Sequence, residues 1–197
     1  TAPEDMLDAF ARGLEDIRAT GIEDQALNVG DTAFMFSLPN AYGEPVSLES
    51  ILADGPVVLT WYRGGWCPYC NMELKALQEA LPEIRKQGAE LVAITPEVPD
   101  RSVDVVDSNQ LEFEVLSDVG NKVGKKYGIV FKLPDEVASI YDQHIQLEKY
   151  NQEKSNELPM PVTYVIDRDG VIRYAFIDAD YTRRAEPNEI IAVLTEM

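Results

Sequence analysis

The 197-residue sequence is poor in the residues that cross-link small proteins or hold metals: it has only two cysteines and one histidine. Two cysteines are too few for the disulfide framework of a small secreted domain. A structural zinc site typically takes four ligands, and beyond the cysteines the chain offers only His144 and carboxylates. The sequence therefore argues against a disulfide-stapled scaffold and against a metal site.

Basic residues and long apolar runs are also scarce. Lys and Arg number 17 against 35 Asp and Glu, which gives a net charge of −18. Phosphates repel such a charge, so we expect neither nucleic acid nor an anionic membrane surface as a partner. No apolar run approaches the length of a membrane span, and the first ten residues lack the basic and apolar regions of a signal peptide. We expect a cytoplasmic protein.

The order of the apolar patterns predicts an α/β sandwich with a mixed sheet. Residues 4–18 repeat apolar side chains at helical steps, whereas Phe34, Phe36 and Leu38 alternate as in a strand. The apolar run 56–62 is typical of a central strand that is covered on both faces. The remaining expected strands are a short one at 46–48, one at 89–97, one at 113–116 and a hairpin at 162–177. The remaining expected helices are one after Cys67 that runs to about 88 with a kink at Pro82, one at 100–111, a short one at 118–129 and a final one from Pro187.

We expect residues 1–27 to be an N-terminal helical extension and residues 28–197 to be the main domain. Residues 132–159 do not fit the minimal plan of this domain, and we expect them to be a helical insertion within it. The insertion has an apolar stripe that needs a covering surface, and we expect it to pack near Cys67. The lone histidine is expected to be a packed side chain of this stripe, which consists of Val137, Ile140, Tyr141, His144 and Ile145.

Both cysteines lie in one C-x-x-C motif, where the apolar run 56–62 gives way to a helical pattern. The N-terminus of a helix favours the thiolate of Cys67, and Pro68 is compatible with the first helical turn. Cys70 lies one turn further in, so we expect Cys67 to be the nucleophile and Cys70 to be the buried resolving thiol. Arg63, four residues upstream, adds positive potential.

Two less favoured interpretations remain beside a reactive dithiol. A structural disulfide across so short a loop would constrain little of the unfolded chain, and two inert buried cysteines would share this spacing only by coincidence. Of the aromatic residues around the motif, Trp61, Tyr62 and Tyr69 are expected to form wall and core. Trp66, directly before Cys67, is expected to stay exposed and to shape the docking of partners.

Four stretches of the chain resemble a known family: VGDTAFMFSLPNAYGEPVSL, VVLTWYRGGWCPYCNMELKAL, VLSDVGNKVGKKYGI and PVTYVIDRDGVIRYAFID. They are similar to the redoxin branch of the thioredoxin-like fold, the alkyl hydroperoxide reductase and thiol-specific antioxidant superfamily, and within it to peroxiredoxin-like proteins. The resemblance covers residues 28–197. It implies a thioredoxin-like sandwich with an N-terminal hairpin extension, and a cis Met160–Pro161 bond that faces the dithiol.

The sequence departs from typical peroxiredoxins around the first cysteine. Those enzymes carry Pro-x-x-x-Thr-x-x-Cys, but this chain has Thr60 and Gly64 at the proline and threonine positions. They also place an arginine before the late strand, where this chain has Met160-Pro161-Val162. The hydrogen-bond donors that the sequence offers to a peroxide are Arg63, Thr60, the backbone amides of residues 64–67, and the more distant Arg183 or Arg184.

Three functions stay open at this point. A thiol peroxidase would form a sulfenic acid on Cys67 and then a Cys67–Cys70 disulfide. A thiol–disulfide reductase would use the same two residues on protein or small disulfides, and a redox-sensing interaction module would use them without catalysis. The resemblance implies a hydroperoxide or disulfide substrate, a thioredoxin- or glutathione-type reductant and no cofactor, and it allows a homodimer.

Overall fold

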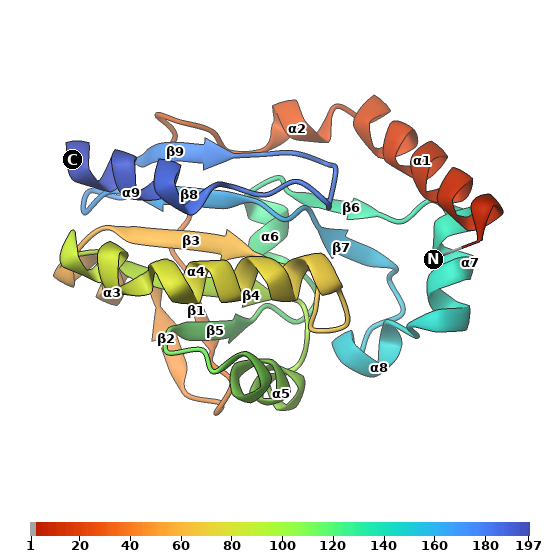
Figure 1. The fold of residues 1–197 in the computed structure, drawn as a ribbon, viewed down its shortest axis with the longest axis horizontal. Coiled ribbons are helices and arrows are strands. Elements are labelled where there is room, and N and C mark those ends of the chain that lie inside the picture. The colour runs from red at the N-terminus through yellow and green to blue at the C-terminus, as the bar shows by residue number, and fades with distance from the viewer. Residues whose placement is uncertain (1–2) are drawn as a thin grey trace.

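The computed structural model describes residues 3–197 and shows a mixed β-sheet between layers of helices (Figure 1). The sheet has five strands in the order β5-β4-β3-β8-β9, and two short antiparallel pairs, β1 with β2 and β6 with β7, lie outside it. The strands are β1 (Ser37–Pro39), β2 (Pro45–Ser47), β3 (Val57–Trp61), β4 (Glu90–Thr95), β5 (Glu114–Ser117), β6 (Val130–Lys132), β7 (Glu157–Pro159), β8 (Thr163–Ile166) and β9 (Ile172–Phe176). The helices are α1 (Glu4–Ala19), α2 (Ile22–Gln25), α3 (Leu48–Asp54), α4 (Pro68–Lys86), α5 (Pro99–Asn109), α6 (Lys122–Lys126), α7 (Asp135–His144), α8 (Glu148–Asn151) and α9 (Pro187–Glu196). The predicted α/β class is confirmed.

The central strand β3 positions the cysteine motif. It pairs in parallel with β4 and antiparallel with β8, with Trp61 opposite Ile94 and Thr60 opposite Thr163. All five of its residues are buried, as expected for an apolar, β-branched run covered on both faces. Because β3 ends at Trp61, the chain leaves the middle of the sheet directly into the loop that carries Cys67.

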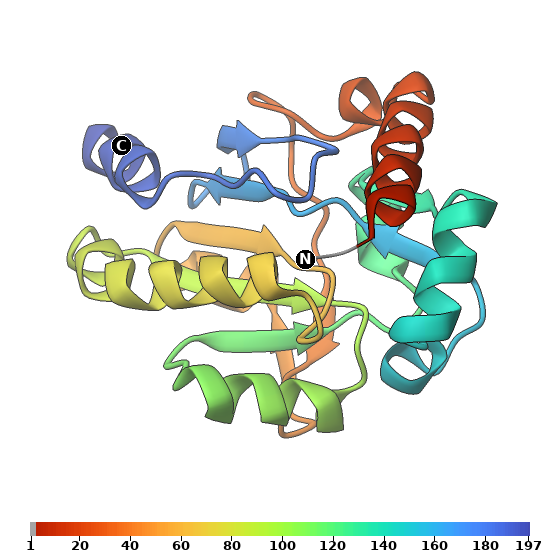
Figure 2. The same ribbon diagram turned by 45° about the vertical axis from the view of Figure 1, so that its right-hand side comes forward.

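Successive side chains of β3 point to opposite faces of the sheet, and each face has its own apolar core. Val58 packs with residues of α4 and α9 on one face, while Leu59 packs with residues of α3 and α6 on the other. Figure 2 shows α4 and α9 together on the same side of the sheet. The helix α4 continues through Pro82, and Met72, near its start, is 67% exposed.

The segment 30–40 runs along both edges of the sheet. The N–H groups of Gly30 and Ala33 donate to the carbonyls of Ile172 and Gly170, at 2.9 and 2.8 Å, beside the start of β9. At the other edge, Asn40 forms a bridge to Leu116 of β5. The strand predicted over Phe34–Leu38 is shorter than expected and begins only at Ser37, because the chain crosses from one edge of the sheet to the other before it.

The insertion forms a compact unit at one end of the sheet, on the right-hand side of Figures 1 and 2. It contains α7 and α8 between the paired strands β6 and β7, so the helical prediction is confirmed. Helix α1 packs on α7 so closely that a Cβ atom on Gly13 would lie 2.6 Å from Val137 Cγ2. The cluster buried inside the insertion consists of Leu133, Val137, Ala138, Tyr141, Leu147 and Leu158.

The division at residue 27 stays a prediction. Ile17 of α1 and Ile22 of α2 lie in the same apolar cluster as Leu59 of the central sheet. None of the helices described in residues 3–197 is both long and apolar enough to span a membrane.

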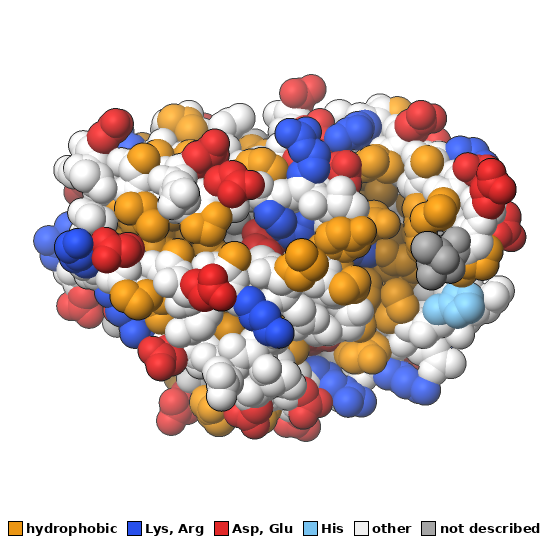
Figure 3. Space-filling model, in the orientation of Figure 1, with side chains coloured by type: hydrophobic (Ala, Val, Ile, Leu, Met, Phe, Trp, Pro, Cys, Tyr) orange, Lys and Arg blue, Asp and Glu red, His pale blue; other side chains and the backbone are white. Residues whose placement is uncertain are grey.

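Two predictions about this end of the molecule are wrong. His144 is exposed, because it is the last residue of α7 and lies in a shallow groove against α1 (Figure 3). The Met160–Pro161 bond is trans, as is every peptide bond in the described part of the chain. Trans is the default even before proline, and the Met160 N–H extends the pairing of this segment by donating to the Ile129 carbonyl at 2.8 Å.

Candidate active site

Cys67 is the N-cap residue of α4, and Pro68 is the first residue of the helix. Both cysteines are free thiols, and both are buried, with 2% of Cys67 and none of Cys70 exposed. The predicted placement of the C-x-x-C motif at the junction of strand and helix is therefore confirmed. Both sulfurs lie at the N-terminus of α4, one helical turn apart.

The two sulfurs have opposite acid–base properties. The pKa of Cys67 is lowered to about 6, chiefly because the Cys70 thiol hydrogen-bonds to it, with further contributions from the positive charges of Arg63 and Arg184 that outweigh burial. The pKa of Cys70 is raised well above its ordinary value by burial and by its hydrogen bond and repulsion with Cys67. Near neutral pH the pair thus holds one thiolate, on Cys67, and one thiol, on Cys70.

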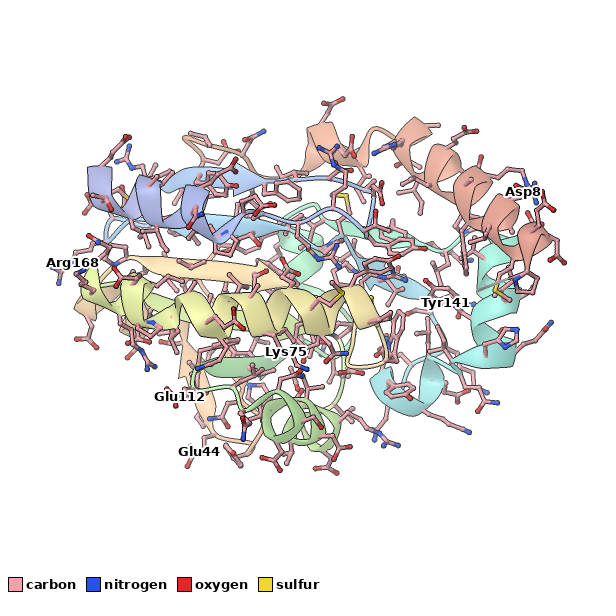
Figure 4. The ribbon with its side chains drawn as sticks, in the orientation of Figure 1. Asp8, Glu44, Lys75, Glu112, Tyr141 and Arg168 are labelled. Atoms are coloured by element: carbon pink, nitrogen blue, oxygen red, sulfur yellow. The ribbon has the colours of Figure 1, made fainter. Side chains whose placement is uncertain are left out.

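Arg63 is held by aromatic side chains. It is buried, donates a hydrogen bond to the Tyr141 hydroxyl, and its guanidinium carbon lies 4.2, 5.0 and 5.6 Å from the ring centres of Tyr181, Trp66 and Tyr141. Such cation–π contacts fix the charge without neutralising it. Its Nε has no acceptor among the described residues. Figure 4 shows Tyr141 between α7 and the start of α4, so the insertion packs near the dithiol as predicted.

A small cavity of about 20 Å³ lies against Arg63, Tyr141 and Tyr181. This volume is enough for about one water-sized molecule. Its other walls are Gly13 and apolar side chains from α1, from β6, from the insertion and from the segment after β9: Phe10, Leu14, Ile17, Phe131, Leu133, Val137 and Ala179. Helix α1 and the insertion, which lie outside the minimal sandwich, therefore supply much of the lining of the space next to Arg63.

A second arginine contacts the other cysteine. Arg184 donates from Nη2 to Cys70 Sγ at 3.4 Å and from Nε to Glu73 Oε2 at 2.6 Å. The description of Arg184 as distant was wrong, because the segment after β9 returns over the start of α4. Arg183 instead pairs with Asp178 at 2.7 Å and is 64% exposed.

Glu73 was missed by the sequence analysis. Burial raises its pKa, and the charge and hydrogen bond of Arg184, whose Nε lies 2.6 Å from Glu73 Oε2, oppose that shift and hold the two side chains as an ion pair. A carboxylate three residues after Cys70, between positions of the apolar stripe of α4, is the signal that could have identified it. Side chains three apart share a face of a helix.

A second buried carboxylate, Glu97, holds the loop before the dithiol and was also missed. Its Oε2 accepts the Gly65 N–H at 3.0 Å, and burial raises its pKa to about 7. A Cβ atom on Gly64, whose φ is +155°, would lie 2.2 Å from Trp66 Nε1 and 2.9 Å from Glu97 Oε1. A side chain at this position, such as the threonine of typical peroxiredoxins, would therefore require Trp66 and Glu97 to move and would strain the backbone.

The other predicted site residues lie around the dithiol or in the strands next to it. The Thr60 hydroxyl lies within the sheet, 2.9 Å from the Thr163 hydroxyl, and Pro161 is buried two residues before β8. Trp66, expected to be exposed, is half-buried against Tyr141. Tyr69, expected to belong to wall and core, is instead 42% exposed, because it faces outward from the first turn of α4 and only makes an edge contact with Tyr181, at 5.9 Å between ring centres. Within residues 3–197, no group of three His, Cys, Asp or Glu side chains could hold a metal ion.

Comparisons with known proteins show which family the chain belongs to and which structures share its fold. The family model described as "AhpC/TSA family" matches residues 29–175. Chloroplastic peroxiredoxin Q of Sedum lineare is 29% identical over 147 residues, which cover 75% of this chain and 67% of that protein. The thiol-disulfide oxidoreductase ResA of Bacillus thuringiensis subsp. konkukian is 22% identical over 151 residues, covering 76% and 70%. The structure of peroxidoxin BcpB from Mycobacterium tuberculosis superposes with a TM-score of 0.69 at 22% identity, covering 87% and 98%, and this likeness supports the thioredoxin-like fold.

Proposed function

Because the chain belongs to the AhpC/TSA family, we propose that it is a thiol peroxidase in which Cys67 reduces hydroperoxides and Cys70 resolves the product. The Cys67 thiolate attacks one peroxide oxygen, the O–O bond breaks, and water or an alcohol leaves. Cys67 is then a sulfenic acid, which condenses with the Cys70 thiol to a disulfide and water. An external thiol reductant of the thioredoxin or glutathione type returns both residues to the reduced state.

The observation that carries this proposal is that Cys67 combines a pKa of about 6 with an exposure of only 2%. The low pKa supplies the nucleophile at neutral pH. The burial favours a small substrate, because a disulfide in another protein must bring its own sulfur into line with the attacking thiolate. Hydrogen peroxide needs little more room than a water molecule.

Arg63 takes the role of the missing peroxiredoxin residues. Negative charge develops on the leaving oxygen as the O–O bond breaks, and donors fixed in a buried site stabilise such charge. Arg63 has an Nε donor that finds no acceptor in residues 3–197, and its guanidinium is held in place by three rings. The backbone amides at the start of α4 point the positive end of a helix at the same region.

A second candidate is a thiol–disulfide oxidoreductase. The specific observation in its favour is the C-x-x-C dithiol itself, with a reactive outer sulfur and a protonated inner one, together with the likeness to an oxidoreductase of that class. Such an enzyme would attack a substrate disulfide with Cys67 and release the reduced product through Cys70. The non-catalytic sensor, a homodimer and a cytoplasmic location stay predictions.

Stopped-flow fluorescence of the reduced protein tests the choice, because Trp66 directly precedes Cys67. We expect a fast change with hydrogen peroxide or an organic hydroperoxide, clearly faster than the reaction of a free thiol of the same pKa, and no such change in Cys67→Ser. If the rate equals that of the free thiol while a small disulfide is reduced quickly, the protein is an oxidoreductase of the second kind.

A further inference from the structure

A buried ion pair fixes a guanidinium group against the sulfur of Cys70. Arg184 donates from Nη2 to Cys70 Sγ at 3.4 Å and from Nε to Glu73 Oε2 at 2.6 Å. Its Nη1 donates to the backbone carbonyls of Tyr181 and Arg183. The side chains of Arg184 and Glu73 are only 12% and 4% exposed, so each guanidinium nitrogen has a partner and the group is held in one place.

We propose that Arg184 is a catalytic residue for the step in which Cys70 attacks Cys67, and that Glu73 is the positioning residue that aims it. The inference rests on the proposed function, since it concerns the second half of that cycle. The Cys70 thiol has to lose its proton as it attacks, yet burial opposes its ionisation. A hydrogen bond from a charged donor stabilises the negative charge that develops on its sulfur.

The step balances without any further reagent. A bond forms between the two sulfurs, while the S–H bond of Cys70 and the S–O bond of the Cys67 sulfenic acid break. The proton and the hydroxide leave together as water. The Cys67 sulfur is reduced and the Cys70 sulfur is oxidised by the same amount, so the disulfide stores the oxidation that the peroxide delivered.

Burial and Cys67 keep Cys70 protonated, and the carboxylate of Glu73 limits how far Arg184 opposes them. An arginine without a counter-charge would favour a permanent Cys70 thiolate, and the hydrogen bond that Cys70 donates to Cys67 would be lost. That hydrogen bond is the largest cause of the low pKa of Cys67. A carboxylate on Arg184 reduces the field of the guanidinium but leaves its Nη2–H group pointing at the sulfur.

The change of Cys70 ionisation with pH gives this role a signature. The titratable and charged groups that act on or face Cys70 are Cys67, Arg184, Arg63, Glu73, Glu97, Tyr62 and Tyr141. Arg184→Gln removes a positive charge, so the pH midpoint of the attack by Cys70 should rise. Glu73→Gln removes a negative charge but keeps an acceptor for Nε, so the midpoint should fall. A merely structural role would not move the two midpoints in opposite directions.

The experiment separates the two half-reactions. Reduced protein is mixed with hydrogen peroxide at pH 8, where Cys67 is ionised, and quenched samples are analysed by mass spectrometry for dimedone-trapped sulfenic acid and for the disulfide. We expect Arg184→Gln to form sulfenic acid at close to the wild-type rate and to form the disulfide about tenfold more slowly or worse, the loss expected for a hydrogen bond to a charged group. Arg183→Gln and Glu79→Gln, on exposed residues, are the matched controls and should match wild type in both phases.

Two further arms keep the test decisive. Because Arg184→Gln leaves a buried carboxylate unpaired, it could unfold the chain, and the double variant Glu73→Gln/Arg184→Gln removes both charges and should still show slow disulfide formation. Wild-type rates and midpoints in both variants would overturn the proposal. If the wild-type protein forms no sulfenic acid, the proposed function fails by itself. The attack of Cys70 is then measured on a Cys67–thionitrobenzoate mixed disulfide, from which it releases the coloured thiolate. Slower release in the Arg184 variants would support the role of Arg184, and wild-type release would contradict it.

Discussion

The dithiol has two arginines, and they are held in different ways. Arg63, next to Cys67, is surrounded by the rings of Trp66, Tyr141 and Tyr181. Arg184, next to Cys70, is paired with the carboxylate of Glu73. Of the two, Arg63 has the larger effect on the pKa of Cys67, and Arg184 has the larger effect on Cys70.

The difference shows how one loop can support two thiols of opposite character. Aromatic rings and a neutral hydroxyl stabilise a cation but carry no negative charge, so the field of Arg63 remains available to the thiolate of Cys67. A carboxylate cancels much of the field of Arg184, so Cys70 receives a directed donor without being ionised at rest. The aromatic side therefore promotes ionisation, and the carboxylate side restrains it.

The largest expected effect separates the two cysteines themselves. Cys67→Ser should abolish turnover of every substrate, because it removes the only low-pKa sulfur. Cys70→Ser should still react once with peroxide and should accumulate a sulfenic acid or a mixed disulfide that mass spectrometry can trap. Full activity in Cys67→Ser would mean that the assignment of the nucleophile is wrong.

Removing the charge on the aromatic side should be the next largest effect. Arg63→Gln should lower the second-order rate with peroxide about a hundredfold, the usual loss for one donor to developing oxygen charge, and should also raise the pKa of Cys67. Reduction of a small disulfide should fall less, because no oxygen charge develops there. Arg183→Gln serves as the surface control, and an equal loss in both reactions would contradict a role at the peroxide oxygens.

The acidity of Cys67 can be read directly from its alkylation. Only the thiolate reacts, and the pKa is lowered to about 6, so the rate with iodoacetamide should stay near its plateau down to pH 7 and fall as pH drops through about 6. The expected loss between pH 7 and pH 5 is about tenfold. Peptide mapping should find the label on Cys67 and not on Cys70. A midpoint near 8.5, the value of a free thiol, would remove the electrostatic argument for both arginines.

A smaller effect is expected from the hydroxyl that anchors Arg63. Tyr141→Phe keeps the ring contacts with Trp66 and Phe10 but removes the acceptor of the buried guanidinium. An unpaired buried donor costs about 1–3 kcal/mol, so the free energy of unfolding in urea should fall by this amount, with a peroxide rate up to about tenfold lower. Tyr42→Phe, on a residue that is 69% exposed, should change neither quantity.

The smallest effect should come from a residue that contacts neither Arg63 nor Arg184. His144→Ala should leave the peroxide rate unchanged and should alter the free energy of unfolding by no more than about 0.5 kcal/mol, as is usual for exposed positions. A histidine packed in the apolar stripe, as predicted from the sequence, would instead give a larger loss of stability. A clear loss of peroxide rate at unchanged stability would show that the end of α7 takes part in the reaction.

The place of Arg63 beside the dithiol could be predicted from the sequence, whereas that of Arg184 could not. The β3–Cys67–α4 unit was predictable because its signals are local: a continuous apolar run, a proline in the first helical turn and two cysteines one turn apart. Arg63 was found for the same reason. Arg184 and Glu73 were not, because their contact depends on how a segment more than a hundred residues later returns over α4. Local periodicity also predicted that His144 would be packed, but this residue ends α7 and lies beyond the surface that covers the middle of the apolar stripe.

The path of segment 30–40 has a consequence for self-association. A sheet edge with free N–H and C=O groups is a template for another chain to join by strand addition, which leads to swapped dimers and fibrils. Here the same segment hydrogen-bonds beside the start of β9 and bridges to Leu116 of β5. One stretch of chain therefore covers part of both edge strands of the sheet. Copies of the molecule that meet in solution are therefore steered away from backbone pairing at these places and toward contacts between side chains, where charge and shape decide whether they stay together.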